Sequence, residues 1–221
     1  MAQCSERIQP RYSVTAPFSD GAPLVCFCLS NRDGRLDEAI AEEQRAHELE
    51  PLSLIIGTNL GTLLYLARQY DRAIDQYRKA LEIDPNFIIA HWMLALAYEQ
   101  KKMYTEALAE LRTAVALSAR NSIALALLGH VLAQSGSKGE AQEILGELNE
   151  VRKRTYVSSY RVAAIYEGLD EREQAFEWLQ RAYDERDPWL IWLKLDPVLD
   201  NLRSDARFEE LTRRLGLPPV G

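Results

Sequence analysis

The chain contains 221 residues, of which 47% are hydrophobic and 27% are charged, a composition typical of folded soluble domains. Its 26 basic and 33 acidic residues give a net charge of -7, which repels nucleic-acid phosphates and disfavours nucleic acid as a partner. No window reaches the roughly 18 to 20 consecutive apolar residues that cross a bilayer, so we expect no membrane partner.

Residues 1–19 show neither helical periodicity nor repeat residues, which predicts a disordered or poorly anchored tail. The cysteines are Cys4, Cys26 and Cys28, and this odd number implies no disulfide framework. The last two lack the two-residue gap of metal knuckles and a nearby histidine, which favours buried thiols over a metal site. The apolar segment 22–29 has no small-x-small cleavage site, so we expect a cytoplasmic protein.

A 34-residue repeat dominates the rest of the sequence. One row of equally spaced alanines consists of Ala39, Ala73, Ala107, Ala141 and Ala175. A second row, seven residues later, consists of Ala46, Ala80, Ala114 and Ala182, with Leu148 in the remaining place. A fixed period of this length indicates a stacked array of helices. The period defines an array over residues 20–189, with units at about 20–53, 54–87, 88–121, 122–155 and 156–189.

Each complete unit reads as two helices. In the unit 54–87, one face of the first helix carries Gly57, Leu60, Gly61 and Leu64, and the second helix carries Ala73, Tyr77, Ala80 and Leu81 at helical spacing. Small residues recur where the two helices must approach, at Gly61, Ala95, Gly129 and Ala163. Pro51, Pro85 and Pro188 follow the second helices and end them.

These residues resemble the tetratricopeptide repeat, whose motif has a leucine–small pair, an aromatic residue, two alanines and a closing proline. The unit 54–87 carries the motif as Leu60-Gly61, Tyr70, Ala73, Tyr77, Ala80 and Pro85. Phe27 takes the place of the small residue in the unit 20–53, which is therefore degenerate. The resemblance implies an all-α, right-handed superhelical solenoid of antiparallel helix pairs.

Residues 190–221 form the expected C-terminal capping segment. The sequence from Trp189 to Leu193 begins like another repeat, and Asp196-Pro197 interrupts it. The residues that follow at helical spacing are Leu199, Leu202, Phe208, Leu211 and Leu215. A helical cap would cover the last apolar face of the array. This ending is similar to the ends of tetratricopeptide regions in bacterial multidomain regulators, whose catalytic and DNA-reading motifs this sequence lacks.

The resemblance implies that the first helices line a concave groove, and the residues left free by packing identify its surface. They are Ile55, Thr58, Asn59, Thr62, Tyr65, Ile89, Trp92, Leu96, Glu99, Ile123, His130, Tyr160 and Arg161. Trp92, Tyr65 and Tyr160 are of the types that dominate binding hot spots. Alternatively, these three fill space between adjacent first helices or lie under the tails.

The sequence predicts no catalytic residue, cofactor or metal. His47, His91 and His130 stand at different repeat positions, so the repeat geometry does not bring them together. We expect non-catalytic binding of a peptide or protein segment in the groove. A carboxylate grip is disfavoured, because Ile89, Trp92 and Met93 occupy positions that need cationic donors.

A second interpretation remains open. The chain could be a regulatory or self-associating fragment of a larger bacterial signalling or transcription regulator, with a homo-oligomer formed through the incomplete first unit.

Overall fold

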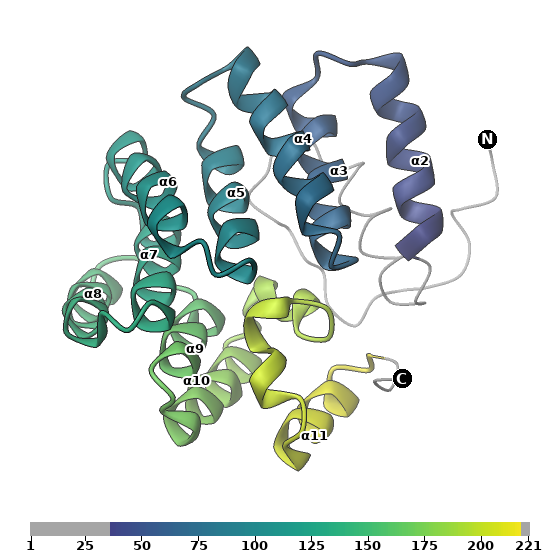
Figure 1. The fold of residues 1–221 in the computed structure, drawn as a ribbon. Coiled ribbons are helices and arrows are strands. Elements are labelled where there is room, and N and C mark those ends of the chain that lie inside the picture. The colour runs from purple at the N-terminus through teal and green to yellow at the C-terminus, as the bar shows by residue number, and fades with distance from the viewer. Residues whose placement is uncertain (1–35, 218–221) are drawn as a thin grey trace.

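The computed structural model describes residues 36–217, which form helices and turns without strands (Figure 1). The predicted tail, the start of the first unit and the three cysteines lie outside these described residues. Helix α2 (Leu36–Leu49) precedes four antiparallel pairs. The pairs are α3 (Leu54–Leu66) with α4 (Tyr70–Ile83), α5 (Ile88–Gln100) with α6 (Tyr104–Leu117), α7 (Ser122–Gln134) with α8 (Lys138–Arg152), and α9 (Ser159–Gly168) with α10 (Arg172–Asp184). The chain continues through the short 3₁₀ helices η1 (Pro188–Trp192) and η2 (Pro197–Leu202) to α11 (Ala206–Arg214).

Polar residues define the start of three first helices. The side chains of Ser53, Asn121 and Ser158 accept hydrogen bonds from backbone N–H groups in the first turns of α3, α7 and α9. These N-caps satisfy donors that the helix itself leaves unpaired. They fix where the first helices of their units begin.

The turn between the two helices of each unit uses one left-handed residue. Arg68, Lys102, Gly136 and Asp170 stand 34 residues apart and have φ angles of 62°, 60°, 89° and 64°. Glycine adopts this conformation most readily, yet it occurs at just one of the four positions. The repeat geometry therefore imposes the turn on three residues that are not glycine.

The repeated small residues let the helices of each pair approach closely. A Cβ atom added to Gly61 would lie 2.5 Å from the ring of Tyr77, and one added to Gly129 would lie 2.9 Å from Ile144 and Ile165. Ala95 and Ala163, at the same repeat position, are fully buried. The alanine rows from Ala73 to Ala182 are also buried. These contacts confirm the predicted all-α solenoid of helix pairs.

The first helices form the inner layer of the curved array. Helix α3 contacts α5, α5 contacts α7, and α7 packs closely on α9, whereas the second helices make few contacts with one another. A curved stack brings its inner elements together and spreads its outer ones. The first helices therefore line the concave side, and α4, α6, α8 and α10 form the outer layer (Figure 1).

The C-terminal segment closes the last unit in two ways. Helix α11 packs beside α10, where Arg207 pairs with Glu173 at 2.8 Å and Arg214 donates to Gln180 at 2.7 Å. Both contacts join residues 34 apart, so α11 keeps the register of a second helix. The 3₁₀ helices instead lie against α9.

Within residues 36–217, no helix combines the length and apolar character needed to cross a membrane.

Candidate binding groove

The residues predicted to line the groove all lie on first helices, but most of them are buried. Ile55 is the exposed member of the set, with 50% of its surface accessible. The half-buried members are Asn59, Thr62, Ile89 and Ile123. The buried members are Thr58, Tyr65, Trp92, Leu96, Glu99, His130, Tyr160 and Arg161. The concave surface is therefore less open than the residue pattern suggested.

The two threonines use their hydroxyl groups within α3. Thr58 donates to the carbonyl oxygen of Leu54 at 2.7 Å, and Thr62 donates to that of Thr58 at 2.9 Å. Such bonds to the preceding helical turn are common for threonine. Neither hydroxyl has a free proton to offer to a partner.

Four buried side chains leave hydrogen-bonding atoms unpaired. They are the Tyr65 hydroxyl, the Trp92 indole nitrogen, His130 Nε2, and Nε and Nη1 of Arg161, none of which has a hydrogen-bond partner among residues 36–217. Each side chain is more than nine-tenths buried. They come one from each of α3, α5, α7 and α9. Buried polar groups in folded proteins are normally paired, so this arrangement asks for an explanation.

Two carboxylates hold His130 in its charged form. Its Nδ1 lies 2.8 Å from the carbonyl oxygen of Ala164, and its Nε2 lies 3.9 Å from Glu99 Oε1. Burial lowers the pKa of His130. The negative charges of Glu99 and Glu167 raise it by a larger amount, so the pKa reaches about 9. At neutral pH both ring nitrogens therefore carry hydrogen, and Nε2 is a donor.

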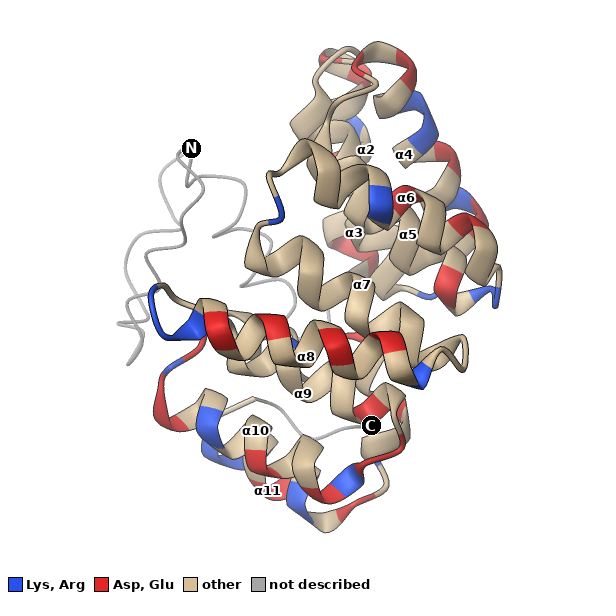
Figure 2. Ribbon diagram, turned by 90° about the vertical axis from the view of Figure 1, so that its left-hand side faces the viewer, with Lys and Arg blue, Asp and Glu red and all other residues tan. Residues whose placement is uncertain are grey.

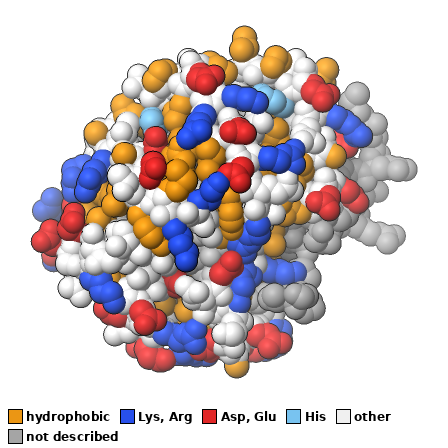
Figure 3. Space-filling view, viewed as in Figure 1, with side chains coloured by type: hydrophobic (Ala, Val, Ile, Leu, Met, Phe, Trp, Pro, Cys, Tyr) orange, Lys and Arg blue, Asp and Glu red, His pale blue; other side chains and the backbone are white. Residues whose placement is uncertain are grey.

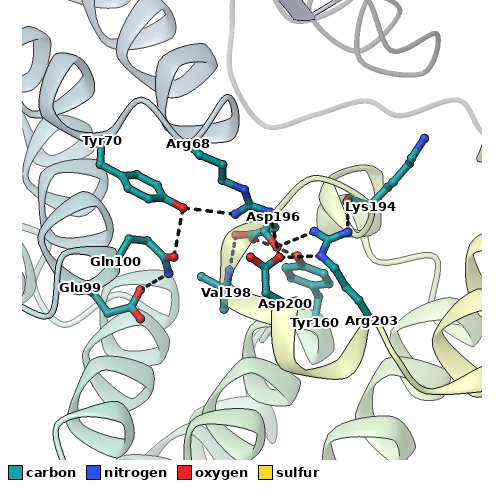
Figure 4. A network of polar contacts seen from close by, with 10 residues as sticks. All are labelled: Arg68, Tyr70, Glu99, Gln100, Tyr160, Lys194, Asp196, Val198, Asp200 and Arg203. Carbon is teal, nitrogen blue, oxygen red and sulfur yellow. Dashed lines mark hydrogen bonds and ion pairs between the residues drawn. The ribbon is translucent and has the colours of Figure 1, made fainter. Parts of the chain in front are cut away.

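The segment 188–203 covers the C-terminal end of the concave face (Figure 4). The Tyr160 hydroxyl donates to Asp196 Oδ2 at 2.9 Å, and the Arg161 guanidinium lies 4.2 Å from the centre of the Trp189 ring. Arg68, in the turn before α4, donates to Asp200 Oδ1 at 2.8 Å. This segment therefore spans from α9 to the second unit. Tyr160 therefore contacts the chain's own C-terminal segment.

A second chain of polar contacts ties the cap to α7 and α9. Gln134 Nε2 donates to Glu167 Oε2 at 2.9 Å, and Asn201 Nδ2 donates to Glu167 Oε1 at 2.6 Å. Burial raises the pKa of Glu167, although His130 and these amides oppose the increase. Glu167 stands two repeats after Glu99, so the 34-residue period indicates it as a residue of the concave face as well. Asn201 lies in the irregular cap, where no periodicity could indicate it.

No curated protein sequence matches the chain. Two family models do match: one described as TPR repeat at residues 61–102, and one described as Tetratricopeptide repeat at residues 88–121. The structure defines a helical-repeat solenoid. Its repeats within residues 61–121 are similar to tetratricopeptide repeats, a class of repeat that generally mediates protein–protein interactions.

Solved structures of low sequence identity share this fold. A tetratricopeptide repeat protein from Parabacteroides merdae is 17% identical, with a TM-score of 0.58 over 85% of this chain and 74% of that one. Kinesin light chain TPR-like repeats from Podosopora anserina are 18% identical, with a TM-score of 0.54 over 73% and 92%. MamA is 20% identical, with a TM-score of 0.51 over 72% of this chain and 94% of that one.

Within residues 36–217, no three His, Cys, Asp or Glu side chains are grouped to hold a metal.

Proposed function

We propose that the chain binds a segment of another protein against its concave face and catalyses no reaction itself. The observation that carries this proposal is the set of buried groups without a hydrogen-bond partner on Tyr65, Trp92 and Arg161, whereas His130 Nε2 already faces Glu99. A buried donor without a partner costs roughly 1–3 kcal/mol of stability. A partner that supplies the missing acceptors would recover this energy on binding.

The chemistry of these groups specifies the partner. The hydroxyl, the indole N–H, the charged imidazole and the guanidinium all donate hydrogen bonds. Glu99 and Asp196 lie near His130 and Arg161, at 3.9 Å and 4.0 Å, and their negative charge repels an anionic partner. The partner must therefore accept hydrogen bonds and carry little negative charge. The backbone carbonyl oxygens of an extended, uncharged or weakly charged peptide segment satisfy both requirements.

Peptides selected from a random library displayed on phage provide the test. The proposal expects enriched sequences without clusters of acidic residues. Their affinity should fall about tenfold in Tyr65→Phe and Trp92→Phe, since each variant removes one hydrogen bond. Tyr183→Phe is the matched control, because Tyr183 lies on the outer helix α10, where Arg214 stacks on its ring. Selected peptides that bind all variants equally would refute the concave site, as would a library that yields no binder.

The second candidate function is a regulatory part of a larger bacterial regulator, in which the groove docks a segment of the same protein. The observation that favours it is the cap itself, which already occupies the end of the concave face through Tyr160 and Asp196. Asp200→Asn weakens the contact with Arg68 that holds η2 across the groove. If the cap controls access, this variant binds the selected peptides more tightly than the wild type. Equal affinity would argue against such regulation.

A further inference from the structure

Within residues 36–217, α2 is the one second helix that no first helix precedes (Figure 1). Its alanines Ala39 and Ala46 are half-buried, whereas the alanines at the same repeat positions in α4, α6, α8 and α10 are at most 4% exposed. Ile40 is the one buried residue of α2. The face of α2 that corresponds to the packed face of the later second helices is therefore incompletely covered.

The connection that follows α2 is also more exposed than its equivalents. Leu49 is 84% exposed, whereas Ile83 and Leu117, at the same repeat position, are 47% and 38% exposed. Leu52, in the same connection, is 75% exposed. Figure 3 shows hydrophobic side chains along the upper edge of the molecule, where Figure 1 places this connection. Apolar surface gathered at one end of an array marks a place where another element packs.

The sequence before α2 has the register of the turns within the later units. Helices α2, α4, α6, α8 and α10 begin at residues 36, 70, 104, 138 and 172, which are 34 residues apart. The left-handed residues of the later turns stand two residues before α4, α6, α8 and α10, and Gly34 stands two residues before α2. Glycine adopts the left-handed conformation most readily. The sequence therefore favours a reversal of the chain directly before α2.

Residues 23–32 have the register and the composition of a first helix. They stand four repeats before α9, which is the shortest of the first helices. Pro23 takes the position of Ser159, the first residue of α9, and proline is favoured at that place in a helix. The segment carries one charged residue, Arg32. Helices α3 and α7 carry none, and Figure 2 shows α7 free of charged residues above the acidic row of α8.

The residue that departs from the repeat motif in this segment has a counterpart on α2. In the second unit, a Cβ atom on Gly61 would lie 2.5 Å from the Tyr77 ring, so a small residue faces a large one. One repeat earlier, these positions hold Phe27 and Glu43. Burial raises the pKa of the Glu43 carboxyl, and its hydrogen bond with Asn59 of α3 opposes this increase. Because Glu43 reaches toward α3, the large ring at this crossing can come from the first helix.

We propose that residues 23–32, which lie outside the described part of the chain, form the first helix of the first unit and pack on the open face of α2. Residues 33–35 then form the turn, as residues 67–69 do between α3 and α4. A segment joined by so short a turn is present at a roughly millimolar or higher effective concentration, which favours it over a partner in solution.

This arrangement has two consequences for binding. Leu24, Cys28 and Asn31 take the repeat positions of Thr58, Thr62 and Tyr65, so the concave face gains one more helix. Self-association through an incomplete first unit loses the surface that it needs. Neither consequence depends on the proposed binding of a peptide in the groove.

The reactivity of Cys26 tests the proposal in the full wild-type chain. Cys26 takes the repeat position of Leu60 and Leu94, which are 3% and 2% exposed. Labelling with N-ethylmaleimide, followed by digestion and mass spectrometry, gives the reaction rate of each cysteine separately. We expect Cys26 to react at least about 100-fold more slowly in the native chain than in concentrated urea, because a packed helix must open before its buried thiol reacts.

Two variants show whether α2 provides the protection. Ala46→Glu places a charge on the open face, and Ala109→Glu makes the same change at an exposed site on α6. The first should speed the reaction of Cys26 about tenfold or more, and the second should leave it unchanged. Hydrogen exchange of the wild type needs no variant, and the amides of residues 27–32 should be protected in it.

Several outcomes would overturn the proposal. They are equal Cys26 rates in the native and unfolded chains, fast exchange of the amides of residues 27–32, and no effect of Ala46→Glu on the labelling rate. Protection of Cys26 that grows with protein concentration would also overturn it, because the segment would then pack on a second copy of the chain.

Discussion

Replacing Tyr65 with phenylalanine should stabilise the chain while it weakens peptide binding. The Tyr65 side chain is 2% exposed, and its hydroxyl has no hydrogen-bond partner among residues 36–217. Burial raises the pKa of this hydroxyl well above its ordinary value, so it stays neutral. An unpaired buried hydroxyl costs about 1–3 kcal/mol, and phenylalanine keeps the ring while removing the cost. We expect the free energy of unfolding to rise by about 1–2 kcal/mol.

Urea unfolding followed by circular dichroism measures the change, and the melting temperature should rise by roughly 2–4 °C for each kcal/mol gained. Tyr160→Phe is the matched control, because the Tyr160 hydroxyl donates to Asp196 at 2.9 Å. Its loss should cost about 1–3 kcal/mol, since it removes the hydrogen bond that the buried carboxylate oxygen of Asp196 accepts. If Tyr65→Phe is destabilised as much as Tyr160→Phe, the Tyr65 hydroxyl is paired in the folded protein and the reasoning fails.

Four further substitutions examine packing, turn geometry and charge. Gly129→Ala should lower the free energy of unfolding by about 1–3 kcal/mol, because its Cβ would press on Ile144 and Ile165. Gly146→Ala, where no atom lies within 4 Å, should raise it by about 0.5–1 kcal/mol in the same urea titration. Gly136→Ala should cost about 1–2 kcal/mol through its φ of 89° alone, since its added Cβ also meets no atom, and an unchanged unfolding midpoint would contradict this. Folding raises the pKa of His130 from 6.5 to about 9, so this residue adds roughly 3 kcal/mol to the free energy of unfolding. The contribution is complete below pH 6.5 and is lost as pH rises through 9. Unfolding titrations between about pH 6 and pH 10 should show this loss in the wild type, and His130→Gln should remove that part of the pH dependence.

The scaffold could be predicted because its residues repeat. Each buried alanine and each small residue at a helix contact stands 34 positions from its equivalent, so five weak signals support one register. The interior position of His91 could be predicted in the same way, and its ring lies 2.9 Å from the carbonyl oxygen of Pro85. The left-handed turns could not be predicted, because Arg68, Lys102 and Asp170 are not residue types that favour a positive φ.

The openness of the groove could not be predicted, because it depends on how closely the first helices approach. Tyr65 and Trp92 stand at positions that the repeat motif leaves free, yet both are buried. The contacts of the cap could not be predicted from the sequence either. Asp196 caps the short 3₁₀ helix η2 and Asp200 lies within it, where no period exists, and their partners Tyr160 and Arg68 are 36 and 132 residues away. Such pairings arise from the curvature of the whole array.

The cap makes stability and access to the groove inseparable at one end of the molecule. Helix α11 covers α10 in the register of a further repeat, while η2 turns inward and accepts a hydrogen bond from Tyr160 through Asp196. One continuous segment, residues 188–214, performs both tasks, so we expect substitutions within it to change the folding energy and the competition with a proposed partner together. Tyr65 and Trp92 have unpaired groups whose removal does not disturb a hydrogen bond within residues 36–217. If the proposed groove binds a peptide, affinities measured with these two variants would report contacts with that peptide, whereas affinities measured with cap variants would report displacement of the cap.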